Sequence, residues 1–284
     1  MDRAAQIASL ALEALLVEAA VTPKPGLVDR ANCGAHADMD FFTFQISAAA
    51  IAPFLPVFVR TGIEHTDDVP TLLAPLQRVG LEAERAMFAR TGGVNTHKGA
   101  IFSFGVLLGA AGLALRRDEK CTAKCVLDLV QEICAGICRR HFDGLDACTP
   151  ETKGDAAYLA CGAMGARGTA EAGFPLVSRI ALPLYRTLLD KGLTVNDALV
   201  DVLVTLITLN DDTNILGRHH LGVLHEVQAA ARRAEALGGM AEPEGCAAIL
   251  QMDADFIRKW ISPGGSADLL AVTHFLYALE RAEG

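Results

Sequence analysis

The residues best suited to chemistry stand in the segment Gly92-Gly93-Val94-Asn95-Thr96-His97-Lys98-Gly99. The apolar stretch that follows predicts a helix from about Lys98 to Leu115. The dipole of such a helix places about half a positive charge at its N-terminus, where His97 and Lys98 would be repelled. An anion bound there, held by free backbone N–H groups and by these two side chains, would remove the conflict. The segment therefore predicts a phosphate site.

In this interpretation His97 can carry a proton, and either Asn95 or Thr96 is the N-cap of the helix. The alternative from these residues alone is an ordinary glycine turn, with Lys98 extending into water.

A second polar segment, Thr22-Pro23-Lys24-Pro25-Gly26, places a lysine between two prolines. Prolines restrict the backbone, so Lys24 should be presented from a stiff loop. The same loop continues through Asp29 to His36 and Asp38, and so adds two carboxylates and a histidine. A solvated loop between helices is the alternative interpretation.

A third segment, from Gly162 to Gly173, has several glycines around Arg167 and Glu171. Glycines let the backbone approach a ligand closely, and Arg167 could bind a phosphate through two hydrogen bonds. A flexible connection would have the same composition.

The segment 210–214 offers Asp212 among oxygen ligands suited to Mg²⁺, and Arg218 follows about one turn later. Helix capping would also explain Asp212. The segment 262–268, Ser-Pro-Gly-Gly-Ser-Ala-Asp, could form a backbone nest for an anion or a simple turn. A helical bundle can gather such breaks at one end of its core. Together they predict a polyphosphate site with a divalent cation.

Hydrophobic residues make up 51% of the 284 residues and aromatic residues 6%, a composition typical of packed helices. Apolar spacing of three and four residues predicts an all-α fold without strands. The breaks are short, so one multi-helix domain over residues 1–284 is expected, with the site formed by interhelical loops. The predicted helices are 4–20, 41–60, 70–90, 98–116, 121–142, 154–164, 175–191, 195–209, 214–237, 243–260 and 266–281.

Charge and cysteine usage exclude several classes of function. The net charge of −9, with scattered basic residues, argues against nucleic-acid binding. Two uncharged stretches, 41–59 and 99–115, approach the length of a membrane span, but they contain prolines, polar residues or several glycines and are expected to be core helices. On the predicted helix 121–142, Cys121 and Cys125 face away from Cys134 and Cys138, which disfavours a structural metal site. The N-terminus has no secretory signal, so a cytoplasmic protein with free thiols is expected.

The chain resembles the triphosphoribosyl-dephospho-CoA synthases, which make the precursor of the prosthetic group of citrate lyase and malonate decarboxylase. The resemblance spans nearly the whole chain, and Glu84 also matches a family position. It rests on six ordered segments: residues 22–29, residues 34–36 with Asp38, residues 93–99, residues 165–168 with Glu171 and Gly173, residues 212–214, and residues 262–268.

The resemblance implies an enzyme that joins the triphosphoribosyl part of ATP to 3′-dephospho-CoA and releases adenine. An oxocarbenium-like transition state then needs a carboxylate nearby, a base for the attacking hydroxyl, and an acid for adenine. Three groups of residues are assigned on this basis. The phosphate ligands are Lys24, Asn95, His97, Lys98, Arg167 and Arg218. The candidates for Mg²⁺ binding or charge stabilisation are Asp38, Glu84 and Asp212. The acid or base candidates are Asp29, His36 and Glu171.

One departure from the family pattern is Arg218-His219-His220, where Arg-Gly-Gly is expected. Bulky side chains there could crowd a ligand and change substrate preference or activity. The departure supports one rival function, a helical nucleotide-binding protein without catalysis. A second rival is a Mg²⁺-dependent nucleotide or ADP-ribose hydrolase, in which water replaces the hydroxyl acceptor. The dipeptide Asn32-Cys33 favours citrate lyase as the recipient of the product. The apolar composition of the chain is compatible with a homodimer.

Overall fold

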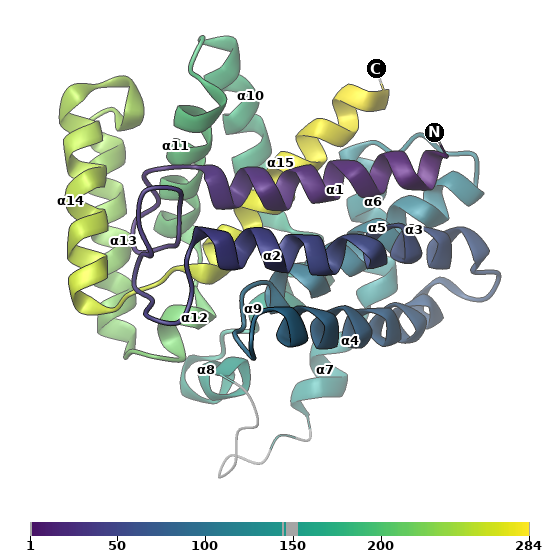
Figure 1. Cartoon of the computed structure of the whole chain (residues 1–284). Helices are drawn as coiled ribbons and strands as arrows, with labels where there is room; N and C mark the ends of the chain where they lie inside the picture. Colours follow the sequence, from purple (N-terminus) through teal and green to yellow (C-terminus); the bar gives the residue numbers. More distant parts are fainter. Residues whose placement is uncertain (1, 144, 146–152, 284) are drawn as a thin grey trace.

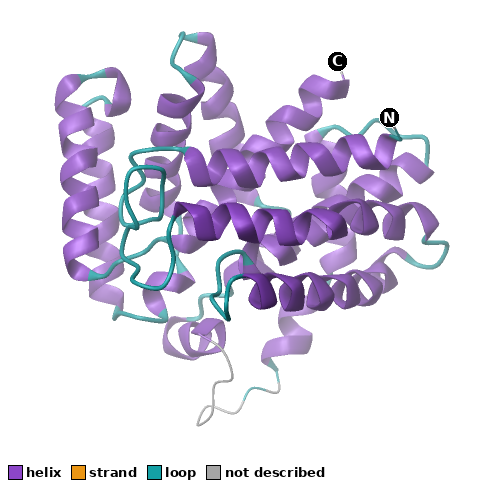
Figure 2. Ribbon diagram, in the orientation of Figure 1, coloured by secondary structure: helices purple, strands orange, loops and turns teal. Residues whose placement is uncertain are grey.

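The computed structural model describes residues 2–143, 145 and 153–283 of the chain. Within these residues every regular element is a helix, and no strand is present (Figures 1 and 2). The predicted all-α fold is confirmed. Buried residues from α1 to α15 form one contiguous hydrophobic core.

The main helices are α1 (Arg3–Ala20), α2 (Phe41–Ile51), α3 (Leu55–Glu64), α4 (Leu73–Arg90), α5 (Lys98–Arg116), α6 (Ala123–Cys134), α7 (Ile137–Phe142), α8 (Lys153–Cys161), α9 (Gly165–Glu171), α10 (Leu182–Asp190), α11 (Val195–Leu209), α12 (Thr213–Leu216), α13 (Leu221–Ala236), α14 (Pro243–Lys259) and α15 (Gly264–Glu283). Short 3₁₀ turns at Ala52–Phe54, Val69–Leu72 and Gly239–Ala241 and a π-helical turn at Val177–Ala181 join some of them.

Helix α5 is the central element of the bundle. Fourteen of its 19 residues are buried, and it contacts α1, α3, α4, α6, α9 and α15. Its start at Lys98 agrees with the sequence prediction. A helix surrounded in this way has a fixed axis, so the residues at its N-terminus have a fixed position.

Helices α3 and α5 approach so closely that backbone touches backbone. A Cβ added to Gly62 would lie 2.0 Å from the carbonyl oxygen of Gly109, and one added to Gly112 would lie 2.0 Å from that of Val59. No side chain fits at either position. The glycines of the apolar stretch are therefore explained by helix packing.

Several long predicted helices are divided in the structure. The 3₁₀ turn Ala52–Phe54 separates α2 from α3 within the predicted helix 41–60. The prediction 121–142 is wrong as one helix, because Gly136 adopts φ 72° and separates α6 from α7. Cys121 consequently precedes α6, and Cys138 lies on the other helix. The prediction 214–237 is interrupted after Leu216, where the N–H of His219 donates to the carbonyl of Ile215 and ends the short helix α12.

Two segments expected to be irregular are partly helical. Residues Gly165–Glu171 form α9, so Arg167 and Glu171 are carried by a short helix and not by an open loop. Helix α15 begins at Gly264, so Asp268 lies within its second turn, not in the turn that precedes it. Both segments contain alanines and residues compatible with a helix once neighbouring elements enclose them.

The cysteines that the structure describes, Cys33, Cys121, Cys125, Cys134, Cys138, Cys161 and Cys246, are free, as predicted. Cys148 lies outside the described residues. Two helical stretches, Phe41–Glu64 and Lys98–Arg116, are long and apolar enough to cross a membrane by length and composition. Core helices of soluble proteins share these properties, so the absence of a membrane span stays a prediction.

We expect Gly62→Ala to lower the free energy of unfolding by about 2 kcal/mol or more, because the methyl group forces α3 away from α5. Gly80→Ala on α4 is the matched control, since its Cβ would meet only Ile101 at 3.9 Å. That variant should be neutral or gain up to about 1 kcal/mol, as Ala favours a helix over Gly. Urea denaturation measures both; equal stabilities would contradict the proposed backbone contact.

Candidate active site

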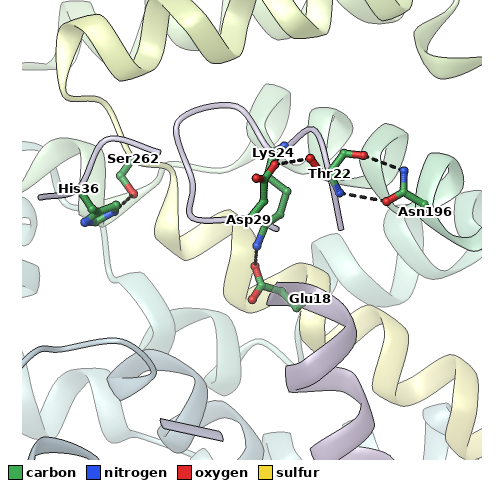
Figure 3. A network of polar contacts seen from close by, with 7 residues as sticks. All are labelled: Glu18, Thr22, Lys24, Asp29, His36, Asn196 and Ser262. Atoms are coloured by element: carbon green, nitrogen blue, oxygen red, sulfur yellow. Dashed lines mark hydrogen bonds and ion pairs between the residues drawn. The ribbon is translucent and has the colours of Figure 1, made fainter. Parts of the chain in front are cut away.

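The six polar segments come together in the structure. The loop from Thr22 to Asp40 lies beside α14, and the remaining segments stand at helix ends near it (Figure 1). Within the loop, the N–H of Ala35 donates to the carbonyl of Gly26 at 2.9 Å. His36 Nε2 lies 2.8 Å from Ser262 Oγ, which joins the loop to the start of α15 (Figure 3).

The start of α15 then contacts two more segments. Asp212 accepts hydrogen bonds from the N–H groups of Gly265 and Ser266. Asp268 faces the first turn of α5, where a Cβ added to Gly99 would lie 2.1 Å from Asp268 Oδ2.

The remaining segment, residues 165–173, contacts residues 212–214 through the start of α9. A Cβ added to Gly165 would lie 3.2 Å from the side chain of Thr213. All six segments thus form one continuous chain of contacts, although they are spread from residue 22 to residue 268.

Lys24 lies in the protein interior, paired with a carboxylate of α1. Its Nζ is 2.5 Å from Glu18 Oε1, and the side chains are 1% and 7% exposed (Figure 3). A buried ion pair is costly to break, because either partner alone would be an uncompensated charge. The charge of Lys24 is therefore balanced by Glu18, and the structure does not present Lys24 as a free phosphate ligand.

Asp29 organises the loop that carries Lys24. Its Oδ2 accepts from Thr22 Oγ1 at 2.6 Å and from the N–H of Lys24 at 3.2 Å. Its Oδ1 accepts from the N–H groups of Ala31 and Asn32 at 2.7 and 2.9 Å. Four donors saturate this buried carboxylate. Its position fits loop stabilisation better than the predicted role of acid or base.

Asp212 has a similar environment at the start of α12. Besides its bonds to the start of α15, its carboxylate accepts from the N–H of Asn214 at 2.9 Å and from Ser266 Oγ at 3.0 Å. Burial raises the pKa of Asp212, while these hydrogen bonds lower it. The side chain caps α12 and fastens it to α15.

Glu171 stands at the far end of α9 and faces α7. It accepts from the N–H groups of Gly136 and Cys138 at 2.6 and 3.3 Å. The hydrogen bond with the Cys138 side chain is the largest cause that lowers the pKa of Glu171. The carboxylate therefore caps α7, at the place where the predicted long helix breaks.

His36 and Asp38 occupy the outer part of the loop. His36 Nδ1 lies 3.8 Å from Asp38 Oδ1, and its other nitrogen meets Ser262. The side chain of Asp38 is 63% exposed. Which nitrogen of His36 holds the proton depends on the tautomer, so this residue can either donate to or accept from Ser262.

His97 is buried and neutral. Its Nδ1 lies 2.6 Å from Ser47 Oγ, which itself accepts from Thr96 Oγ1. Burial lowers the pKa of His97 to about 3, and the charge of Lys24 adds to the effect. The expectation that a protonated His97 contributes charge to an anion site is wrong. Its Nε2 is buried and has no hydrogen-bond partner among the described residues.

The N-cap of α5 also differs from the expectation. His97 is the N-cap residue, without a capping side-chain bond of its own. Asn95 nevertheless closes the turn, because its Oδ1 accepts from the N–H of Lys98 at 3.3 Å. Thr96 is directed instead to Ser47 on α2.

Three of the predicted cationic phosphate ligands remain accessible. Lys98 is 51% exposed, and its Nζ lies 3.4 Å from Glu84 Oε2 on α4. Arg218 is exposed and Arg167 is partly accessible to solvent; neither side chain makes a hydrogen bond or ion pair with the described residues. These cations can bind an anion without first breaking a buried interaction.

The predicted metal ligands do not form a common site. Within the described residues, no group of three or more His, Cys, Asp or Glu side chains is placed to hold a metal ion. Asp38 is exposed, Glu84 pairs with Lys98, and Asp212 is saturated by backbone and hydroxyl donors.

Three residues of this region had no predicted role. Glu18 could have been found, because it lies on the apolar face of α1, where a charge needs a buried partner. Asp268 stands in a motif segment, but the sequence does not show that it faces Gly99. Ser47 gives no signal, since its contact with His97 joins two helices.

A groove of about 370 Å³ lies elsewhere, between α6, α10 and α15. Lys124, Arg179 and Arg186 line it together with Asp128 and Glu280. Of the six segments only the one at residues 165–173 reaches this groove, through Ala172 and Gly173, and none of the predicted catalytic, phosphate or metal ligands lines it.

The comparison with protein families identifies the class of protein. Residues 4–284 match the family described as "CitG: ATP:dephospho-CoA triphosphoribosyl transferase", so the chain belongs to this family. The prediction of a transferase enzyme of the triphosphoribosyl-dephospho-CoA synthase type is confirmed, and neither rival function is supported.

Two curated relatives agree with this family. Both are named "Probable 2-(5''-triphosphoribosyl)-3'-dephosphocoenzyme-A synthase" and come from Vibrio cholerae serotype O1, strains M66-2 and ATCC 39315 / El Tor Inaba N16961. Each is 42% identical over 274 residues, which cover 96% of this chain and 88% of the relative. No solved structure matches the chain.

The lowered pKa of His97 predicts a loss of stability in acid. The folded state resists protonation down to about pH 3, whereas in the unfolded chain the histidine binds a proton near pH 6.5, its ordinary pKa. The stabilisation is therefore complete above pH 6.5 and is lost as the pH falls. Between pH 7 and 5 the wild type should lose about 2 kcal/mol more of its free energy of unfolding than His97→Asn.

Urea denaturation at a series of pH values makes this comparison, and the other titrating groups cancel because both proteins share them. Parallel pH profiles for the two proteins would show that His97 is not held neutral by burial.

Proposed function

We propose that the six segments together form the region where the chain transfers the triphosphoribosyl group of ATP to 3′-dephospho-CoA and releases adenine. They are residues 22–29, 34–38, 93–99, 165–173, 212–214 and 262–268, and are together called the six-segment region. The observation that carries the proposal is the continuous chain of contacts from the loop at Thr22 to Asp268. Every segment behind the family resemblance takes part in it. No other described region combines accessible cations with so many of these residues.

The proposed reaction breaks the bond between ribose C1′ and adenine, and forms a bond from C1′ to a ribose hydroxyl of 3′-dephospho-CoA. The electron pair of the broken bond leaves with adenine, which takes up a proton, and the hydroxyl proton passes to a base. The triphosphate is retained. Lys98, Arg167 and Arg218 are suited to hold it, because their positive charges are not neutralised by buried partners.

Mg²⁺ is part of the proposal as a companion of the triphosphate. Since the three predicted carboxylates do not form a common site, the phosphate oxygens would supply most of its ligands. We assign no step of the reaction to it.

We also propose a cytoplasmic location, which the free thiols of the described cysteines support.

A homodimer is proposed through the exposed apolar residues Phe42 and Ile46 of α2 and Leu81 of α4. Light scattering that finds a monomer at micromolar concentration would rule the dimer out. The product is proposed to serve citrate lyase or malonate decarboxylase. The lean of Asn32-Cys33 toward the citrate lyase branch stays a prediction.

Lys98→Met should weaken ATP binding at least tenfold, about 1.4 kcal/mol, because it removes an accessible cation at the start of α5. Lys124→Met is the matched control: it removes an exposed lysine that pairs only with Asp128 on α6. Isothermal titration calorimetry with MgATP measures both variants. An unchanged affinity for Lys98→Met would contradict the anion site at α5.

Incubation of the protein with ATP, Mg²⁺ and 3′-dephospho-CoA should give adenine and a product that contains both the triphosphoribosyl group and dephospho-CoA. Mass spectrometry detects each of them. Adenine formed without 3′-dephospho-CoA would indicate the hydrolase instead, and tight ATP binding without adenine would indicate the non-catalytic alternative.

A further inference from the structure

We propose that Asp268 is the general base that accepts the proton of the attacking ribose hydroxyl. This inference rests on the proposed function and deepens it, because it assigns one chemical step to one side chain.

The geometry places Asp268 at the meeting point of two helix starts. It is in the second turn of α15, and its Oδ2 occupies the space where a side chain at position 99 would be, 2.1 Å from the Cβ position. Gly99 directly follows Lys98, the accessible cation of α5. A carboxylate here lies next to the residue proposed to hold the triphosphate of the same substrate.

The carboxylates of the six-segment region differ in what occupies their oxygens. Asp29 and Asp212 each accept four hydrogen bonds, and Glu171 caps α7. By contrast, Asp268 makes no hydrogen bond or ion pair with the described residues, although it is partly buried. A carboxylate that must take a proton needs a free lone pair directed at the substrate.

The electrostatic surroundings increase the basicity of this carboxylate. Burial raises the pKa of Asp268 well above its ordinary value, and the negative charges of Glu18 on α1 and Asp212 before α12 add to the effect. His97 is neutral and adds no positive charge here. A base with a raised pKa accepts a proton more readily at neutral pH.

The proposed step balances as follows. The hydroxyl O–H bond breaks as the oxygen bonds to C1′, and its proton moves to a carboxylate oxygen of Asp268. The bond from C1′ to adenine breaks, and its electron pair leaves with adenine, which takes a proton from water or from a neighbouring acid. Asp268 then returns its proton to solvent. No oxidant, reductant or further reactant is needed.

The test is Asp268→Asn, which keeps the size of the side chain and removes the base. Its kcat should fall at least about 100-fold, while KM for ATP and for 3′-dephospho-CoA should stay within about threefold. Asp128→Asn on α6 is the matched control and should leave kcat unchanged. Thermal unfolding of Asp268→Asn should occur at or above the wild-type temperature, because no hydrogen bond is lost.

The pH profile separates catalysis from structure. In the wild type, kcat should rise with pH as Asp268 loses its proton, and this acidic limb should be absent from Asp268→Asn. Asp268→Glu should keep the rise of kcat with pH but shift the pH at which the rise is half complete. The longer side chain places its carboxylate at different distances from Glu18 and Asp212, which changes its pKa. A structural role would leave the midpoint unchanged.

Two results would overturn the inference alone: a wild type that makes the transfer product while Asp268→Asn keeps kcat within about threefold, or an Asp268→Asn that loses ATP binding together with thermal stability. A wild type that makes no transfer product would overturn the proposed function, and the role of Asp268 with it.

Discussion

The enclosure of α5 is the constraint on which the rest of the structure depends. Glycines at positions 62 and 112 let the backbones of α3 and α5 touch, and this contact leaves α5 little freedom to shift. The N-terminus of a helix fixed along its length is itself fixed. Lys98 and Gly99 are thereby held at one place, around which the loops of the other segments are arranged.

Side-chain to backbone hydrogen bonds, and not regular structure, give those loops their shape. Asp29 binds three N–H groups of its own loop, and Asp212 binds N–H groups on both sides of the contact between α12 and α15. Each carboxylate replaces hydrogen bonds that a helix or sheet would otherwise supply. Asp29 and Asp212 therefore hold the backbone, whereas Asp268 makes no hydrogen bond or ion pair with the described residues.

The sequence predicted the elements whose apolar periodicity is uninterrupted, among them α5, α11 and α14. It failed where one residue overrides a periodic pattern, as Gly136 does between α6 and α7. It could gather Lys24, Asp212 and Asp268 into one region through the family resemblance, but not distinguish their environments. Whether a lysine meets Glu18 or solvent depends on the packing of helices that are distant in the chain, and residue type alone does not encode that.

The contact between residues 262–268 and the other segments has a consequence for synthesis. As a chain emerges from the ribosome, α1 and the Thr22 loop are made well before Ser262 and Asp268, which follow more than 220 residues later. Until then His36 and Gly99 lack the partners they have in the finished fold. Nascent and truncated chains should thus be packed in part but lack the complete set of contacts that joins the six segments.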